Sequence, residues 1–338
     1  MLGIEKAGAA AVEVHGVAPS FEVHRNRCRY PAEILRFNIA ALVGEAVAFY
    51  ARPRPICSGN SMKLATTAAA LALAAMTASV QAASAQTVSD WRTPDPNNVI
   101  VVETNKGRII AELYPQAAPN HIERVRGLVK SGFYDGLTFF RVISDFMAQT
   151  GDPQNTGVGG SDQPNLTAEF TFRRGADTPL GASFKAGTNE SGWVGVLPVT
   201  SQPSALAVMT ADRKVATWGN FCSGVLGMAR AGDPDSANSQ FFFMRQANAS
   251  LDKTYTAFGR VLQGVDVVRA IKVGEPVPDP QDKMLSVKLL ADLPADKRPS
   301  VQVMDTRSAA FKALVTKRQG ELGAGFTNCD VDVPVQVK

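Results

Sequence analysis

The stretch from Phe139 to Pro153 reads FFRVISDFMAQTGDP, an alternating strand that runs into a turn. Because successive side chains of a strand point to opposite faces, Arg141 shares its face with Phe139 and Ile143. A guanidinium among apolar groups is poorly solvated and keeps its charge, so it suits a fixed hydrogen-bond donor aimed at an uncharged ligand. The alternative is an arginine whose stem packs while its head reaches water, and the alternation alone favours that alternative.

Two further motifs follow along the chain. One reads GVLGMARA over residues 224–231 and continues as SANSQFFF over 236–243, and the other reads LD at 251–252 and YTAFGRV over 255–261. The three motifs, in this order, resemble those of the cyclophilins, the peptidyl-prolyl cis-trans isomerases. The resemblance covers roughly residues 99–293 and is interrupted by an insertion over about 172–219.

The resemblance implies a mainly β fold, a closed eight-stranded antiparallel barrel with one helix over each opening. Periodicity and turn signals agree with it. A helix is expected from Asn120, as its N-cap, to Gly132, and a second over 265–271. Strands are expected over residues 99–102, 108–113, 138–143, 225–229, 241–245 and 257–261. Many short strands with two helices suit an antiparallel barrel with helical caps.

By resemblance, Arg141 is the catalytic residue, and Gln149 orients it together with the substrate carbonyl. The remaining substrate-binding positions are of two kinds. The wall of the proline-ring pocket is expected from Phe146, Met147, Phe242, Leu251 and Tyr255, and the shelf for preceding residues from Ala229, Arg230, Ala231 and Gln240. Each apolar residue alone is better explained as barrel core, and its occurrence with Arg141 and Gln149 favours a site.

Two positions depart from the family pattern. Tyr255 stands where many members carry histidine, and an aromatic ring with a polar tip still closes the wall. Ser250 stands where many eukaryotic members carry tryptophan just before the Leu-Asp pair. We therefore expect catalysis to be retained and tight binding of cyclosporin to be lost.

Prolyl isomerisation needs no cofactor or metal, since it breaks no bond to a neighbouring atom. The catalyst must only prefer the twisted amide, whose rotation barrier is about 20 kcal/mol. The sequence agrees with this chemistry: it holds three histidines, His15, His24 and His121, and no CxxC pair, so neither a zinc site nor a Ser-His triad is expected. It also lacks a P-loop and a dinucleotide fingerprint.

Composition sets looser bounds. The 338 residues are 45% hydrophobic and 20% charged, with a formal net charge of +4, which is too small and too dispersed to suggest nucleic acid. We expect a monomer that acts on X–Pro segments of unfolded or partly folded exported chains. The alternative is a non-catalytic peptide-binding or chaperone module on the same barrel. The insertion keeps this alternative open because it is a segment that could cover the site.

The N-terminal region carries the marks of export. Met62 and Lys63 open an apolar run over 64–76, and Ala83-Ser84-Ala85 has the small-x-small form of a cleavage site before Gln86. The run is too short for a stable membrane span. We therefore expect a signal peptide over 62–85, a linker over 86–98 and a periplasmic location. Residues 1–61 are expected to be a spurious extension, or alternatively a small N-terminal domain.

The insertion and the tail are not explained by the family motifs. The insertion carries Trp193 and Trp218 and is expected to pack on the barrel, as padding or as a lid. The extension over 294–338 has helical composition at 305–322 and alternates at 330–337. After signal removal Cys222 and Cys329 remain, and an even pair in an oxidising compartment is a candidate disulfide; the alternative is two unrelated cysteines.

Overall fold

The computed structural model describes residues 89–338. The expected extension over 1–61, the signal peptide over 62–85 and the first residues of the linker lie outside the described residues. Within residues 89–338 no helix is both long and apolar enough to cross a membrane.

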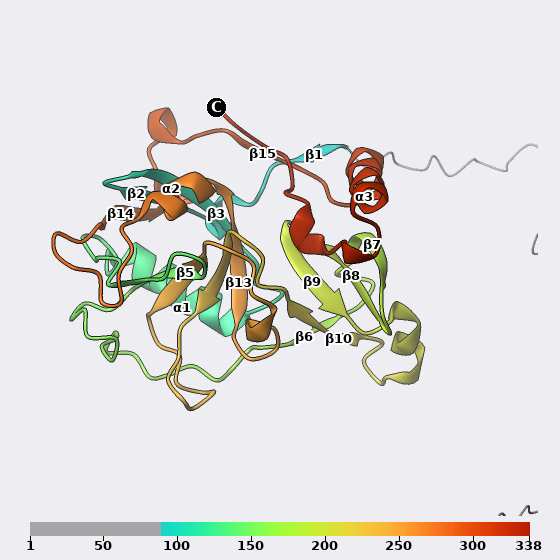
Figure 1. Cartoon of the computed structure of the whole chain (residues 1–338), viewed down its shortest axis with the longest axis horizontal. Coiled ribbons are helices and arrows are strands. Elements are labelled where there is room, and N and C mark those ends of the chain that lie inside the picture. The colour runs from blue at the N-terminus through green and yellow to red at the C-terminus, as the bar shows by residue number, and fades with distance from the viewer. Residues whose placement is uncertain (1–88) are drawn as a thin grey trace, which may run out of the picture. The chain divides into compact units, whose positions relative to one another are not determined.

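The largest sheet has eight antiparallel strands in the order β14-β2-β3-β13-β11-β12-β5-β4. Strands β14, β2, β3, β13 and β5 are labelled in Figure 1. The strands of this sheet include those that carry the three sequence motifs and the adjacent pair expected over residues 99–102 and 108–113. Their bounds are β2 (Val99–Thr104), β3 (Gly107–Leu113), β4 (Arg141–Val142), β5 (Met147–Thr150), β11 (Val225–Met228), β12 (Phe241–Met244), β13 (Ala257–Gln263) and β14 (Met284–Leu289).

The sheet is a curled half-barrel, which corrects the closed barrel predicted from the sequence. Its edge strands β4 and β14 are not neighbours in a ladder. They approach through an isolated bridge between Thr138 and Lys283 and through the Phe139 N–H, which donates to the Asp282 carbonyl at 2.9 Å. The ladder stops because the segment 138–143, predicted as one strand, pairs as a strand only at Arg141–Val142.

Side-chain alternation along β2 divides the apolar residues between two cores. Ile100 and Val102 face an inner core that also holds Ile122 of helix α1 (Pro119–Lys130) and Val268 of helix α2 (Val265–Ala270). Val99 and Val101 face an outer core, shared with the insertion and the C-terminal extension. The half-barrel is therefore covered on its outer face by parts of the chain that the family motifs do not include.

Helix α1 begins differently from the prediction. Its N-cap is Ala118 rather than Asn120, and no side chain of the cap residue accepts a hydrogen bond. Pro119 fixes the first turn, and the carboxylate of Glu169 accepts the N–H groups of Asn120 and His121, both at 3.1 Å. A residue 48 positions from His121 thus performs the capping that the local sequence assigns to Asn120.

The insertion forms a sheet of its own, with five antiparallel strands in the order β6-β10-β9-β8-β7. Trp193 and Leu197 from this sheet are fully buried in the outer core. The strands are β6 (Phe172–Arg174), β7 (Gly181–Ala186), β8 (Asn189–Val194), β9 (Leu197–Ser201) and β10 (Val215–Gly219).

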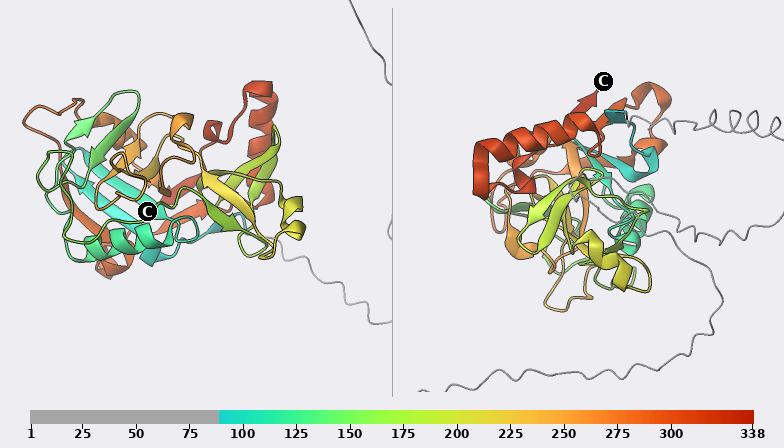
Figure 2. Two further views of the ribbon diagram at one scale, coloured as in Figure 1. Left: turned by 90° about the horizontal axis from the view of Figure 1, so that it is seen from below. Right: turned by 90° about the vertical axis from the view of Figure 1, so that its right-hand side faces the viewer.

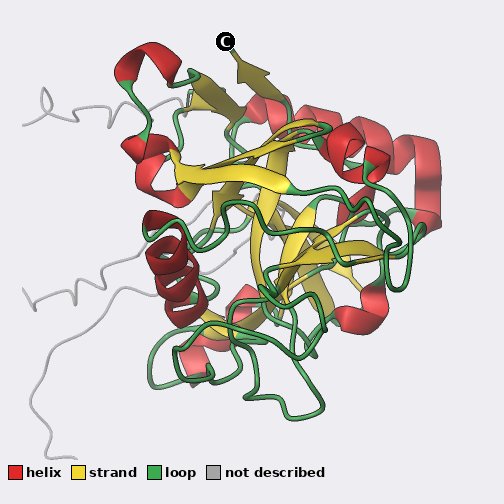
Figure 3. Ribbon diagram, turned by 90° about the vertical axis from the view of Figure 1, so that its left-hand side faces the viewer, coloured by secondary structure: helices red, strands yellow, loops and turns green. Residues whose placement is uncertain are grey.

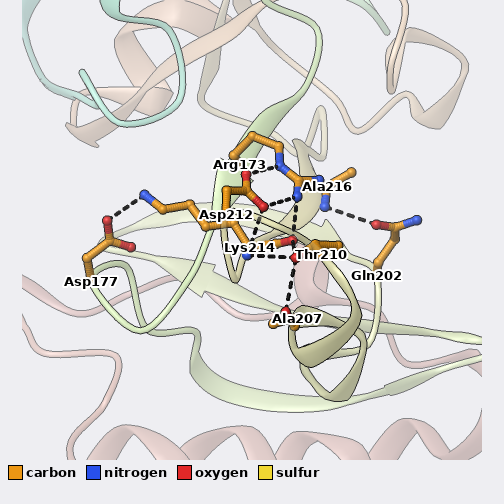
Figure 4. Close-up of polar contacts among 8 residues, drawn as sticks. All are labelled: Arg173, Asp177, Gln202, Ala207, Thr210, Asp212, Lys214 and Ala216. Carbon is orange, nitrogen blue, oxygen red and sulfur yellow. Dashed lines mark hydrogen bonds and ion pairs between the residues drawn. The ribbon is translucent and has the colours of Figure 1, made fainter.

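A polar network fixes the loop between β9 and β10 (Figure 4). Arg173 makes a two-pronged ion pair with Asp212 at 2.6 and 2.9 Å, and Lys214 pairs with Asp177 at 2.6 Å. The same loop holds the 3-10 helix Ser204–Met209, where Leu206, Val208 and Met209 are exposed.

The C-terminal extension docks on the insertion. Helix α3 (Ala309–Leu322) packs against β7 (Figure 2). Its Phe311 ring meets the Trp193 ring edge to face, with a centroid distance of 5.0 Å. A three-stranded sheet joins β1 (Trp91–Arg92), β15 (Val301–Met304) and β16 (Val335–Val337). A disulfide links Cys222 to Cys329, with a Cα–Cα distance of 5.0 Å.

Candidate functional site

One small cavity gathers most of the predicted site residues. Its volume is about 220 Å³. Every predicted residue lines it except Ala231 and Gln240, which line an adjoining groove. The lining consists of Phe140, Arg141, Phe146, Met147, Gln149, Gly157, Ala229, Arg230, Phe242, Leu251 and Tyr255.

Strand register explains why residues far apart in sequence meet here. Arg141 of β4 lies opposite Gln149 of β5, and Gln149 lies opposite Phe242 of β12. Directly paired residues of antiparallel strands share a face of the sheet. The predicted donor, its amide partner and an aromatic wall residue therefore stand in one row across three strands, and Met147 joins this face two residues before Gln149.

The cavity has an apolar floor and wall. Met147, Phe242 and Leu251 are buried, and the Phe242 ring stacks on Phe221 with a centroid distance of 6.0 Å. Tyr255 closes the wall by meeting Phe242 edge to face, also at 6.0 Å. Glycine is required at Gly227, opposite Phe242, because a Cβ there would overlap this ring.

Arg141 is held at two of its three nitrogens. Its Nε donates to Glu275 Oε1 at 2.5 Å, and Nη1 donates to Gln149 Oε1 at 3.2 Å. Among the described residues, Nη2 has no hydrogen-bond partner. The side chain is 36% exposed, so the head is more accessible than a strand of alternating apolar residues predicts. Fixed orientation and an unused donor edge are what a ligand in the cavity requires.

Sequence reasoning missed Glu275. It belongs to none of the three motifs and comes from the loop before β14. An isolated bridge positions it: the Val142 N–H donates to the Gly274 carbonyl at 2.8 Å, and the Gly274 N–H returns the bond at 2.9 Å. This pairing between residues distant in sequence brings the Glu275 carboxylate beside Arg141, and no local sequence pattern predicts it.

A row of amides continues from Arg141 into the groove. Gln149 Nε2 donates to Gln240 Oε1 at 2.8 Å, and Gln240 Nε2 donates to the carbonyls of Gly157 and Gly159 at 3.1 and 2.8 Å. The groove has a volume of about 390 Å³. Its polar groups suit the backbone of an extended peptide.

The groove is bordered by a long loop, residues 151–171, that contains no helix and no continuous strand (Figure 3). Buried Asp152 organises this loop by accepting the N–H groups of Gln154, Thr156 and Gly157 at 2.6–2.9 Å. Burial acts to raise the pKa of Asp152, but these hydrogen bonds prevail and hold it below the usual value.

The insertion contacts the segment that follows Leu251 and lines neither the cavity nor the groove. Asp252, next to Leu251, accepts from Asn220 Nδ2 at 2.7 Å and from the Phe221 N–H at 3.0 Å, just after the insertion ends. Lys253 Nζ lies 3.7 Å from the centre of the Trp218 ring. Among residues 89–338, nothing of the insertion acts as a lid over the site.

Ser250 and His121 lie outside the cavity lining. The exposed Ser250 turns its hydroxyl to Asn248 Oδ1 at 2.7 Å. His121 is fully buried, with Nδ1 2.6 Å from Glu169 Oε2. In the part of the chain that the structure describes, no cluster of three or more His, Cys, Asp or Glu residues is arranged to hold a metal ion.

Comparison with known proteins gives one consistent result. Residues 99–289 match the family model described as cyclophilin type peptidyl-prolyl cis-trans isomerase. A probable peptidyl-prolyl cis-trans isomerase of Brucella suis is 32% identical over 241 residues, which is 67% of this chain and 95% of the relative. Peptidyl-prolyl cis-trans isomerase-like 1 of Mus musculus is 31% identical over 206 residues, 61% of this chain and 95% of the relative.

The fold comparison agrees. The crystal structure of cyclophilin AquaCyp293 from Hirschia baltica superposes with a TM-score of 0.66 at 34% sequence identity. The match covers 73% of this chain and 93% of that structure, so it extends beyond the residues that match the family model.

Proposed function

Because the chain belongs to the cyclophilin-type peptidyl-prolyl cis-trans isomerases, we propose that Arg141 is its catalytic residue and that the cavity of Phe242 and Met147 binds the proline ring. The observation that carries this proposal is the hydrogen-bonded row that starts at Arg141 and Gln149 beside an apolar cavity and continues to Gln240 in the adjoining groove. A proline-containing segment would place its ring in the cavity and its preceding residues along the amides.

The chemistry follows from what changes during rotation. As the amide twists it loses resonance, and the prolyl nitrogen becomes pyramidal and basic. A donor aimed at this nitrogen binds the twisted state more tightly than the planar one, and each ~1.4 kcal/mol of that preference raises the rate tenfold. Arg141 Nη2 is the donor that Glu275 and Gln149 leave unused.

The test compares the purified protein with Arg141→Ala on short Ala-Pro peptides, by exchange NMR. Loss of a charge-assisted hydrogen bond worth about 1.5–3 kcal/mol should lower the rate about 10- to 150-fold. Stability should change by less than about 1 kcal/mol, because the pair with Glu275 is 36% and 54% exposed. Arg213→Ala, an exposed arginine that lines neither cavity nor groove, is the matched control. Wild-type turnover by Arg141→Ala would refute the mechanism.

We also propose that the protein acts on X–Pro segments of exported chains in the periplasm. The signal-like sequence over 62–85 supports this, and a disulfide between Cys222 and Cys329 is typical of oxidising compartments. The expected mature N-terminus is near Gln86, which intact mass of the cell-derived protein would measure. A product that retains residues 64–76 would contradict export by cleavage.

The non-catalytic alternative is kept open in the sequence by the insertion, as a segment that could cover the site. The insertion lines neither the cavity nor the groove, so it leaves the site open. If this protein were found to bind proline-containing peptides without accelerating their isomerisation, the non-catalytic alternative would be supported.

A further inference from the structure

We propose that Arg230 makes this site selective for X–Pro segments that carry an acidic residue in one of the two positions before the proline. The inference rests on the proposed function, because it names the substrate class of the same site. Arg230 lines both the cavity and the groove, so a peptide that passes from one to the other runs beside it.

The charge of Arg230 is oriented but not neutralised. Its Nε donates to the Thr254 carbonyl at 3.1 Å, and Nη1 donates to the carbonyls of Ala231 and Gly232 at 2.8 and 3.4 Å. Carbonyl oxygens fix the guanidinium plane and leave its full positive charge. Among the described residues Nη2 makes no hydrogen bond, which leaves donor capacity for a carboxylate.

Two aromatic rings hold the same guanidinium. Its Cζ lies 4.5 Å from the centre of the Tyr255 ring and 5.5 Å from that of Phe170. Contact with aromatic faces stabilises a cation without supplying a counter-ion. Because the side chain is already ordered, a ligand that pairs with it loses less conformational entropy than one that must order a free arginine.

The surroundings provide no competing carboxylate. No acidic residue lines the cavity or the groove. Asp233 and Asp235, the nearest acids in sequence, accept the backbone N–H groups of Asp235 and Ala168 instead, at 3.0 and 2.8 Å. Arg141, the other cation of the cavity, already pairs with Glu275. The uncompensated charge that a bound peptide meets is therefore that of Arg230.

The experiment uses blocked peptides Ala-Glu-Pro-Phe, Ala-Gln-Pro-Phe and Ala-Lys-Pro-Phe, with Glu-Ala-Pro-Phe and Gln-Ala-Pro-Phe for the earlier position. Exchange NMR gives the isomerisation rate without a coupling protease, and chemical-shift titration gives Kd from the same samples. In one of the two positions the wild-type protein should favour Glu over Gln about three- to tenfold at low ionic strength. High salt, or a pH below about 4, should abolish the preference.

Variants assign the preference to one residue. Arg230→Gln should bring the Glu-to-Gln ratio to about one, whatever its absolute rate, and Arg230→Glu should turn the preference toward Lys. Arg213→Gln removes the same charge from outside the site and should keep the wild-type ratio. Equal treatment of Glu and Gln peptides by the wild type, or a preference that survives Arg230→Gln, would overturn the inference.

Because Kd and the isomerisation rate are measured separately, the experiment distinguishes the proposed catalytic function from the proposed selectivity of Arg230. If the wild type binds Glu peptides more tightly than Gln peptides but accelerates the isomerisation of neither, the proposed function is refuted and the role of Arg230 is supported. A protein that accelerates all peptides equally, with equal Kd values, supports the function and refutes the role of Arg230.

Discussion

Removal of the disulfide between Cys222 and Cys329 should lower stability by several kcal/mol. The two cysteines are 107 residues apart, and the chain-entropy relation for a closed loop of that length gives about 5 kcal/mol. This value is an upper bound, since residual structure in the unfolded chain reduces it. Cys329→Ser is the suitable change, because Cys222 is fully buried and Cys329 is not.

Guanidinium unfolding followed by tryptophan fluorescence measures the effect. Oxidised wild type should unfold at the highest midpoint, while reduced wild type and Cys329→Ser should share a lower one. Reductant should leave Cys329→Ser unchanged, which controls for its other effects. Equal midpoints for oxidised and reduced wild type, or two alkylatable thiols in protein never exposed to reductant, would refute the reasoning.

Three further predictions concern single residues. Glu275→Gln removes the charge that fixes Arg141 Nε and should lower kcat/KM by up to about fivefold, mainly through kcat. Glu275→Asp keeps a carboxylate and should retain more activity. An unchanged kcat in Glu275→Gln would argue against positioning by Glu275. Burial acts to raise the pKa of Glu169, but bonds from the His121 ring and from the N–H groups of His121 and Asn120 hold it below the usual value. The Glu169 carboxylate therefore stabilises the folded state fully above the unfolded-state pKa of about 4.3, and this stabilisation is lost as pH falls through the folded-state pKa. Because Glu169→Gln lacks the carboxylate at every pH, the stability of this variant should depend less on pH in the acid range. Circular dichroism measured against pH tests this. We expect the wild type to bind cyclosporin weakly and Ser250→Trp to bind it more tightly, which calorimetry measures; nanomolar binding by the unmodified protein would contradict this.

Most residues of the cavity could be predicted from sequence because they lie within the three motifs, but Phe140 and Gly157, which also line it, were not predicted. The register Arg141–Gln149–Phe242 follows from pairing between β4, β5 and β12, which carry two of those motifs. Glu275 could not be predicted, since its position depends on an isolated bridge at Gly274.

The misses in the fold have the same origin. Asn120 is a good cap by local rules, yet a distant carboxylate, Glu169, takes that role. The closed barrel is not formed because the segment predicted as a strand over 138–143 forms a ladder at only Arg141 and Val142. In the first case a contact with a residue distant in sequence replaces the cap that local rules predict. In the second case the tertiary structure does not form the full strand pairing that the local alternation predicts.

The docking of α3 on the insertion has a consequence for the order in which the chain folds. A chain that emerges from its N-terminus, during synthesis or during the proposed export, presents residues 172–219 long before residues 301–337. Trp193 cannot be enclosed until Phe311 arrives, and β1 waits for β15, its partner at the opposite end of the described chain. Truncation before Val301 should therefore expose the insertion to limited proteolysis. A prolyl isomerase would itself remain incompletely folded until residues 301–337 have emerged.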